Sequence, residues 1–231
     1  MIDDTPRPVV FLICDTESTG LSRPMGVVEV AIRQIDPVSL VTMREWHSLV
    51  DPQQAIEPGA EAIHGICAEM VADEPTLDEF VEHRLCGAFD DVDITFIAHK
   101  VPFDLPLLAG IGTITRSVCT LSLSRHLVKN SANHKLQTLR EHFGFPANEA
   151  HRAMADVATT HRVLGKLLEL SGRTLEQLAS TTEQTYHTMP FGKHKGLLMF
   201  HVPKPYLAWL VAQPGLDPNL LKSAQKAMAM K

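Results

Sequence analysis

Short segments of alternating or unbroken hydrophobic residues dominate the first hundred positions of this chain. Residues 9–16 (VVFLICDT) are apolar and partly β-branched, which predicts a central strand. Residues 27–35 and 40–50 alternate apolar and polar side chains, as half-buried strands do, and the run at 94–98 (ITFIA) predicts one more strand. Three strands in series followed by a later strand favour an antiparallel meander and then a crossover strand.

Helical periodicity fills most of the remaining chain up to residue 181. We expect helices at 60–71, 76–89, 102–109, 120–128, 135–143, 152–170 and 174–181. Gly144 and Gly172 follow two of these segments, near the position where glycine commonly ends a helix. The pattern as a whole predicts an α/β fold, with a mixed sheet and helices on both of its faces.

The end of the chain is expected to form a separate unit. A polar stretch at 181–187 predicts a linker between an N-terminal domain, residues 1–180, and a small C-terminal domain, residues 188–231. In the small domain, MPFGKHKG is rich in turn formers, and KPYLAWLVAQ and PNLLKSAQKAMAM each predict a short helix. Tyr206 and Trp209 lie three apart on the first of these helices. They are either a core pair or a stacking platform, and core burial is the expected role.

Charge is distributed unevenly along the chain. The formal net charge is −6, which argues against a protein that coats nucleic acid. Residues 187–231 nevertheless carry six lysines, no arginine and the single acid Asp217, so they have a net charge of +5 and residues 1–186 have −11. A basic end on an acidic body suggests a contact module for a polyanion. A solvated surface of a small helical domain is the alternative.

Cysteine usage and hydropathy limit the class of protein. The four cysteines, Cys14, Cys67, Cys86 and Cys119, form no CxxC pair and are expected to be reduced thiols in a cytoplasmic protein. His64 and His83 each precede a cysteine by three residues, a spacing found in zinc half-sites, although buried thiols are the commoner explanation. No apolar run approaches the ~20 residues that cross a bilayer. The acidic, proline-containing N-terminus is unlike a signal peptide, so we expect no membrane partner.

Two acids follow the first predicted strand in FLICDTESTGL. Asp15 and Glu17 are two residues apart, and alternation along a strand places them on the same face. Two negative charges at such a short distance repel each other strongly unless a cation lies between them. Carboxylate oxygens at this spacing suit Mg²⁺ or Mn²⁺. Taken alone, the pair is better explained as two solvated acids where a strand leaves the core.

Two later segments supply further groups with possible catalytic roles. FIAHKVPFD places Asp104 in the first turn of a predicted helix, where the helix dipole alone would favour an acid. HRAMAD contains His151 and Asp156, and two residues five apart on one regular helix face directions about 140° apart. Both can face one point if His151 lies on the loop before the helix and Asp156 lies one turn inside it.

In this order, CDTESTGL, AHKVPFD and HRAMAD resemble the three motifs of the DEDDh 3′→5′ exonucleases, over about residues 8–172. The resemblance implies a ribonuclease-H-like exonuclease fold. It also implies that four acids hold two Mg²⁺ or Mn²⁺ ions and that one histidine is the general base. These residues are Asp15, Glu17, Asp104, Asp156 and His151. A neutral histidine near its ordinary pKa of about 6.5 suits the removal of a proton from water.

The same resemblance assigns residues to the end of the nucleic acid. The backbone of Thr16 and the side chain of Glu17 are expected to recognise the terminal 3′-hydroxyl. Leu21, His64 (in IHGI) and Phe103 are expected to pack against the last bases or sugar. Ordinary core packing is the alternative role for Leu21 and Phe103.

One residue departs from the family pattern. The second motif usually has asparagine after its histidine, and this chain has Lys100. Lys100 is expected to contact a phosphate, to displace a metal ion by its own charge, or to point into solvent. The second of these roles would make the chain a nucleic-acid-binding module without catalysis.

The C-terminal segments MPFGKHKG and YLAWL resemble a small domain attached to one DNA exonuclease of this family. Lys193 and Lys195 lie between two glycines and are expected to approach a phosphate backbone. The prediction is therefore a metal-dependent 3′→5′ exonuclease that hydrolyses DNA to nucleoside 5′-monophosphates. Its partner would be single-stranded DNA or duplex 3′ ends, and the resemblance also suggests a homodimer. Trimming of RNA by the same chemistry is the alternative.

Overall fold

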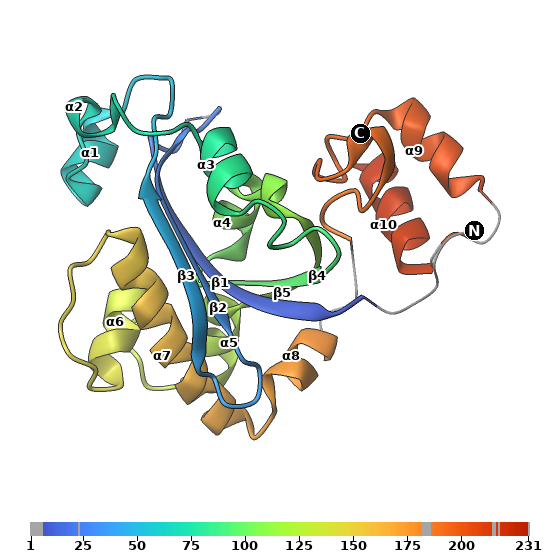
Figure 1. The fold of residues 1–231 in the computed structure, drawn as a ribbon. Helices are drawn as coiled ribbons and strands as arrows, with labels where there is room; N and C mark the ends of the chain where they lie inside the picture. Colours follow the sequence, from blue (N-terminus) through green and yellow to red (C-terminus); the bar gives the residue numbers. More distant parts are fainter. Residues whose placement is uncertain (1–6, 23, 182–185, 214–215, 217, 231) are drawn as a thin grey trace.

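The computed structural model describes residues 7–22, 24–181, 186–213, 216 and 218–230. Its centre is a five-stranded sheet in the order β3-β2-β1-β4-β5 (Figure 1). The strands are β1 (Val9–Ser18), β2 (Val27–Ile35), β3 (Thr42–Leu49), β4 (Asp93–Ala98) and β5 (Thr113–Cys119). β1 pairs antiparallel with β2 and parallel with β4, which confirms the expected meander followed by a crossover strand.

Strand β5 is absent from the sequence prediction. It pairs parallel with β4, and its segment TITRSVC contains three hydroxyl side chains, so no hydrophobic alternation marks it. Thr113 and Thr115 are both buried, at positions where a periodicity argument looks for apolar residues. Tertiary packing at the edge of the sheet, rather than local pattern, therefore determines this strand.

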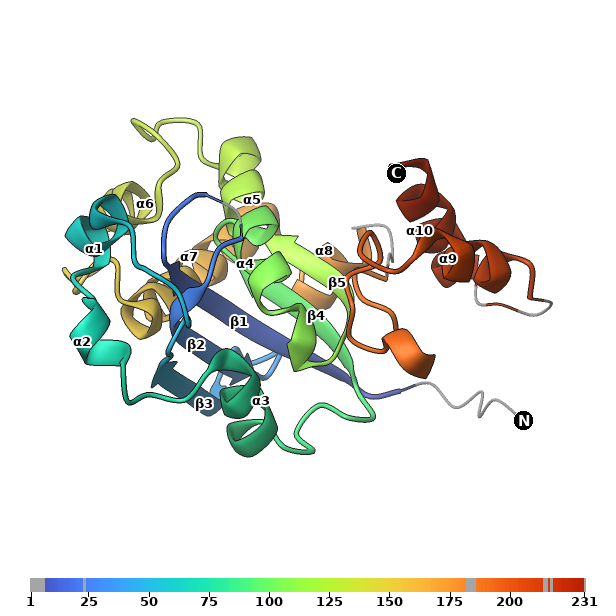
Figure 2. The same cartoon turned by 90° about the horizontal axis from the view of Figure 1, so that it is seen from above.

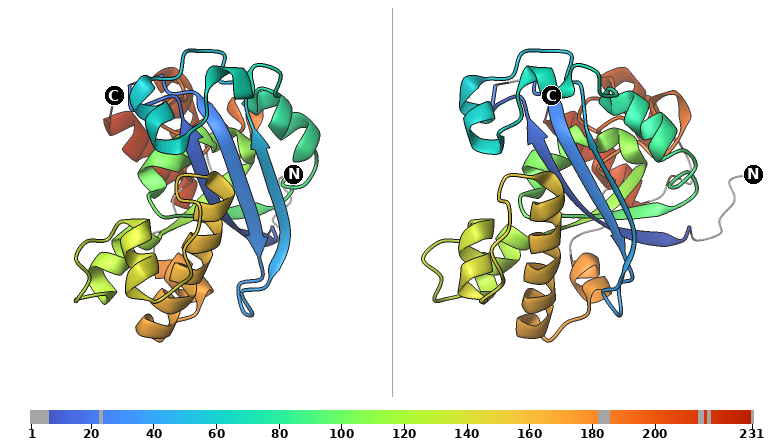
Figure 3. Two further views of the ribbon diagram at one scale, coloured as in Figure 1. Left: turned by 90° about the vertical axis from the view of Figure 1, so that its left-hand side faces the viewer. Right: turned by 60° about the vertical axis from the view of Figure 1, so that its left-hand side comes forward.

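Helices cover both faces of the sheet, as predicted (Figures 1 and 3). On one face lie α3 (Leu77–Arg84) and α4 (Val101–Leu107). On the other lie α5 (Thr120–Leu127), α7 (Ala153–Ser171) and α8 (Leu175–Thr181), with α6 (Leu136–His142) packed against α7. The predicted helix at 60–71 is divided into α1 (Pro58–His64) and α2 (Ala68–Val71), because Gly65 adopts a left-handed conformation with φ 70°. None of the described helices is long and apolar enough to cross a membrane.

The alternation of β1 decides where its acids point. Leu12 and Cys14 lie in the core under α3 and α4, whereas Phe11 and Ile13 lie in the core under α7. The odd-numbered side chains continue on the α7 side as the strand leaves the core, so Asp15 and Glu17 face the beginning of α7. Strand β1 therefore orients the two acids through the packing of the apolar residues that precede them.

The C-terminal module has its own core and is attached to the edge of the sheet (Figure 2). It contains a 3₁₀ turn, η2 (Gly192–His194), and two helices, α9 (Lys204–Val211) and α10 (Pro218–Ala229). The Ile114 amide of β5 donates to Thr188 Oγ1 at 3.0 Å, and the His187 amide donates to the Ile114 carbonyl at 3.1 Å. Most of the expected linker, residues 182–185, lies outside the described residues, so the domain boundaries remain a prediction.

One expectation for this module is wrong. Trp209 is 53% exposed, whereas Tyr206 is partly buried against the core of the module. That core consists of methionine, valine, leucine and alanine side chains, mainly from the loop before α9 and from the two helices. Because these residues already fill the space between α9 and α10, the indole ring is left on the surface.

Candidate active site

The residues of the three motifs converge at the C-terminal end of β1. Asp15 and Glu17 are partly buried there, and Asp104 from α4 and Asp156 from α7 are buried. Helix α7 begins at Ala153, so His151 lies on the preceding loop and Asp156 one turn inside the helix. This confirms the arrangement that the spacing in HRAMAD predicts.

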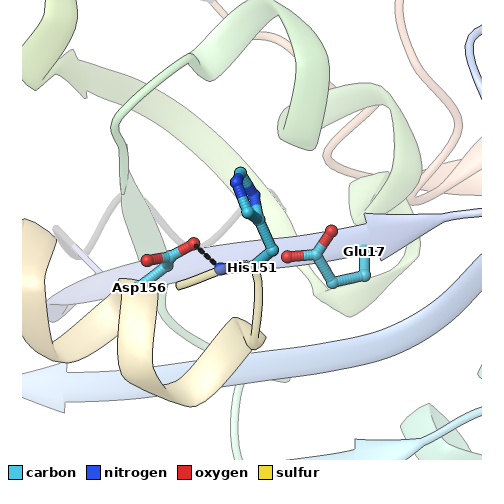
Figure 4. A group of neighbouring side chains, drawn as sticks. All are labelled: Glu17, His151 and Asp156. Atoms are coloured by element: carbon cyan, nitrogen blue, oxygen red, sulfur yellow. Dashed lines mark hydrogen bonds between the residues drawn. The ribbon is translucent and has the colours of Figure 1, made fainter. Parts of the chain in front are cut away.

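Glu17, His151 and Asp156 form a compact group of possible metal ligands. One carboxylate or imidazole atom from each lies within 4.8 Å of the others, and the structure offers no other such group among the residues it describes. Figure 4 shows the three side chains together, with His151 between the two carboxylates. Asp156 also accepts a hydrogen bond from the Gln137 side chain of α6 at 3.0 Å, a contact that no feature of the sequence indicated.

Asp104 is fixed from the opposite side of β1. Its Oδ1 accepts hydrogen bonds from the Thr16 amide at 3.1 Å and from Thr16 Oγ1 at 2.9 Å. Thr16 is buried and its amide is used by this contact, so its clear role here is to position Asp104. The expected contact between the Thr16 backbone and a terminal hydroxyl stays a prediction.

Burial raises the pKa values of the acids in this cluster, and repulsion from neighbouring acids adds to the shift for Asp15 and Glu17. Burial raises the pKa of Asp15 well above its ordinary range, and repulsion from Asp104 and Asp156 adds to this effect. Burial, followed by repulsion from Asp156, raises the pKa of Glu17 to about 8. Burial also raises the pKa of Asp104 to about 7, although the hydrogen bonds from Thr16 oppose the shift. These acids are unfavourable to ionise without a counterion, and their oxygen atoms face one point. Both properties suit the binding of a hard divalent cation.

The backbone at His151 is held in an unfavourable conformation. Its φ of 60° is in the left-handed region, which costs a residue with a side chain about 1 kcal/mol or more. The His151 amide donates to Asp156 Oδ2 at 3.1 Å, the contact drawn in Figure 4. The next residue, Arg152, is held by a separate carboxylate, so the loop is fixed at the histidine and at the residue that follows it.

That carboxylate belongs to Glu29, which sequence analysis did not single out. Glu29 lies opposite Glu17 on β2 and is fully buried. It accepts hydrogen bonds from Arg152 at 3.0 Å, from the Ala153 amide at 2.9 Å and from His47 Nε2 at 2.8 Å. Burial would raise its pKa, but these hydrogen bonds outweigh it and lower the pKa to about 2. An acid inside the otherwise apolar strand VVEVAI was the signal that could have indicated it.

An apolar pocket of 360 Å³ opens beside the acids. Its lining includes Leu21, His64 and Phe103, so the structure brings these three predicted residues together with Glu17. Leu21 is 79% exposed, which rules out the alternative that it packs in the core. Glu57, Ala60 and Ile63 also line this pocket, and sequence analysis did not identify them.

His64 is a structural part of this pocket. Its Nδ1 accepts from the Ile66 amide at 3.0 Å, and its Nε2 lies 3.2 Å from the Ser18 carbonyl. An Nδ1 that accepts leaves the proton on Nε2, which then donates to Ser18. Since both ring nitrogens are engaged, the zinc half-site suggested for His64 and Cys67 does not form in this structure. Neither His-x-x-Cys pair belongs to a metal-ligand cluster in the part of the chain that is described.

Lys100 lies next to Phe103, one of the residues that line the pocket. It is exposed, and its Nζ lies 5.3 Å from the centre of the Phe103 ring. Its positive charge also lowers the pKa of Asp104, against the larger effect of burial. Lys193 and Lys195 are exposed in the C-terminal module, which lies at the opposite end of the sheet, so the structure does not bring them to this site (Figure 2).

Comparison with known proteins identifies the family of this fold and site. Residues 12–164 match the family model RNase_T, described as an exonuclease. The chain belongs to the exonuclease family. Within it, the chain carries the DEDDh set of residues named above. Its membership of this family identifies it as a nuclease. Residues 173–221 match a second family model, QSregVF_b, whose description concerns quorum-sensing-regulated virulence factors.

Individual relatives agree with this membership. Exodeoxyribonuclease 10 of Escherichia coli (strain K12) is 32% identical over 211 residues, which cover 86% of this chain and 89% of that protein. A solved structure of exonuclease X in complex with 5′-overhanging duplex DNA is 28% identical, with a TM-score of 0.57, and the match covers 74% of this chain and 98% of that chain. A structure of exonuclease I, 19% identical with a TM-score of 0.60, covers 75% of this chain and 43% of that chain, and supports the fold alone.

The raised pKa values predict that the metal-free protein loses stability as pH rises. An unfolded carboxyl group loses its proton near pH 4, whereas Asp104 and Glu17 keep theirs until about pH 7 and 8. The folded state therefore binds more protons between pH 4 and 8, and the free energy of unfolding falls across this window. Denaturant unfolding in EDTA should show this fall, and Mn²⁺ should reverse it.

The variant Asp104→Asn isolates one of these groups, because its amide oxygen can still accept from Thr16. In EDTA we expect its stability relative to the natural chain to be greater at pH 8 than at pH 4.5, by on the order of 2 kcal/mol. Asp36→Asn is the matched control, since hydrogen bonds from Ser39 lower the pKa of that exposed acid. A pH-independent difference for Asp104→Asn would contradict the claim that burial raises the pKa of Asp104.

Glu29→Gln should loosen the loop that carries His151. Because it breaks a buried ion pair with Arg152, it should lower the free energy of unfolding by about 3 kcal/mol and reduce nuclease turnover per folded molecule by about tenfold. Glu169→Gln is the control: it removes the exposed pair with Lys166 (2.6 Å) and should cost less than about 1 kcal/mol. Unchanged turnover for Glu29→Gln would show that Glu29 supports the fold alone.

Proposed function

We propose that this chain is a divalent-metal-dependent 3′→5′ exonuclease that shortens DNA from its 3′ end and releases nucleoside 5′-monophosphates. The observation that carries this proposal is the convergence of four acids and His151 beside an apolar pocket. Buried like charges destabilise a fold unless a cation binds them, which supports a metal site, and a histidine beside two of these acids supplies the base that hydrolysis requires.

Two ions, Mg²⁺ or Mn²⁺, are the proposed cofactors. Asp15 would bridge them, Glu17 and Asp156 would complete one site, and Asp104 would serve the second. When bound, such a pair neutralises the charge that develops on the phosphate and favours deprotonation of water. The grouping of Glu17 and Asp156 near one point, with Asp104 held separately by Thr16, supports this division.

His151 is the proposed general base. Its ring lies next to Glu17 and Asp156, where it could remove a proton from a water molecule that attacks the terminal phosphodiester. It is exposed and lies on a loop, so it can transfer that proton to solvent. The hydrogen bonds made by the amide of His151 and by Arg152 position the imidazole without using its nitrogen atoms.

The pocket would hold the last nucleotide. Leu21 and Phe103 offer apolar contact to its base and sugar, and Glu17, at the inner edge of the pocket, would accept a hydrogen bond from the terminal 3′-hydroxyl. Lys100, above the Phe103 ring, would contact a phosphate at the rim. An exposed lysine that lies outside the acidic cluster gives no support to a metal-displacing role.

DNA is the proposed substrate, as single strands or duplex 3′ ends. The relatives named above include an exodeoxyribonuclease and an exonuclease structure with bound duplex DNA. RNA stays the alternative, since none of the pocket residues named above distinguishes the two sugars. A homodimer is likewise a prediction by resemblance. The four cysteines are free thiols, which fits a reducing cytoplasm.

A 5′-labelled oligonucleotide tests the reaction directly. With Mg²⁺ or Mn²⁺, the natural chain should give a ladder that shortens from the 3′ end, and parallel DNA and RNA strands should show the sugar preference. Asp15→Ala should abolish the ladder. His151→Ala should lower turnover by roughly a hundredfold while Mn²⁺ still binds.

His126→Ala, which changes an exposed histidine of α5, is the matched control and should keep the natural rate. An unchanged rate for Asp15→Ala would overturn the proposed reaction. Full activity of His151→Ala would remove the histidine from the mechanism.

A further inference from the structure

The C-terminal module presents an aromatic and basic surface that the cleavage site does not use. Trp209 is 53% exposed, and its ring lies 5.3 Å from that of Tyr206. The Lys193 Nζ lies 5.6 Å from the centre of the Tyr206 ring, and the His194 ring packs edge-on against Tyr206 at 4.6 Å. Four side chains from η2 and α9 thus form one continuous patch.

The turn that carries the lysines is built to approach this ring. Gly192 has φ 74°, a conformation that favours glycine. A side chain there would begin 2.7 Å from the Tyr206 hydroxyl, so only glycine permits the observed contact. Lys193 and Lys195 are exposed on the same turn. The backbone conformation at Gly192 therefore brings the turn with the lysines close to the aromatic rings.

Trp209 is not part of the hydrophobic core of the module. The core of the module is formed without it, by buried residues such as Met189, Leu207 and Leu220. Exposing a tryptophan beside a partly exposed tyrosine leaves apolar surface in water, which is unfavourable for a small domain. Such residues commonly mark a binding surface.

Charge indicates the class of partner. Residues 187–231 carry six lysines and one acid, Asp217, and that acid lies outside the residues that the structure describes. A positive surface with exposed aromatic faces matches the way in which proteins hold unpaired nucleic acid, with bases stacked on the rings and phosphates beside the lysines. The faces of bases inside a duplex are already stacked on one another, so they are not available to an indole ring.

We propose that Trp209, Tyr206, Lys193 and Lys195 form a second binding site for single-stranded nucleic acid, in which bases stack on the aromatic rings. The inference rests on the proposed function in that both sites would bind one substrate. The module lies at the end of the sheet opposite to the acids (Figures 1 and 2). A strand long enough to reach both sites would remain attached to the enzyme at a distance from its 3′ end.

The chain contains two tryptophans, which makes the site directly observable. Trp46 packs edge-on against Phe89 at 5.4 Å, and Trp46→Phe leaves Trp209 as the single indole. In EDTA, which prevents cleavage, an oligothymidine of about twenty nucleotides should quench Trp209 fluorescence, whereas a blunt duplex of equal length should not. Quenching by the duplex to the same extent would overturn the base-stacking proposal.

Substitutions then separate stacking from charge. Trp209→Ala in the natural chain should weaken binding of the oligothymidine about tenfold, measured by anisotropy, and Trp209→Phe should recover most of the loss. Lys193→Gln with Lys195→Gln should reduce the slope of log affinity against log salt by about one or more. Lys166→Gln, which removes an exposed lysine paired with Glu169 on α7, should change neither quantity.

The outcomes distinguish this site from the proposed reaction. Quenching without any shortening of DNA in Mn²⁺ would retain the second site and remove the exonuclease reaction. If DNA is shortened but oligothymidine does not quench Trp209 fluorescence, and Trp209→Ala binds oligothymidine as tightly as the natural chain, the reaction is retained and the second site is overturned. An acidic peptide that quenches Trp209 as strongly as oligothymidine would also overturn it, because the surface would then recognise charge or protein rather than bases.

Discussion

The burial of four carboxylates at one place is the constraint around which this structure is organised. Asp15, Glu17, Asp104 and Asp156 meet where β1 leaves the core, and burial raises the pKa of every one of them. A protein gains no stability from such a group, because each charge is removed from water and placed near others of its own sign. The cluster is consistent with a fold that gives up stability in the free state to bind cations.

The surrounding elements show how that cluster is held. The apolar half of β1 is packed on both faces, so the direction of its acids is fixed by the core. On one side, Thr16 of β1 binds Asp104; on the other, Glu29 binds Arg152 and the beginning of α7. Glu29 is as buried as the other acids, yet its hydrogen-bond partners lower its pKa. The contrast separates Glu29, whose charge is balanced by its hydrogen-bond partners, from the four acids whose pKa values are raised.

Sequence reasoning predicted those parts of the molecule in which local pattern and chemistry agree. The periodicity of α7 placed His151 before the helix and Asp156 inside it, because helix geometry leaves few alternatives. Strand β5 was missed, because buried threonines such as Thr113 carry no hydrophobic signal. Glu29 stands out in the sequence only as an acid in an apolar strand, and its role could not be assigned because two of its partners, Arg152 and Ala153, are 123 and 124 residues away. The exposure of Trp209 depends on how other side chains fill a small core, which no local rule determines.

The central claim is that the acids at the end of β1 form a site for two divalent ions. Calorimetric titration with Mn²⁺ at pH 7, repeated in two buffers of different ionisation enthalpy, measures both the number of ions and the protons they displace. The account predicts two ions per chain, with release of protons because Glu17 and Asp104 are partly protonated at that pH. It also predicts that Asp15→Ala abolishes this binding. Absence of binding, or binding that is unchanged in Asp15→Ala and releases no protons, would contradict it.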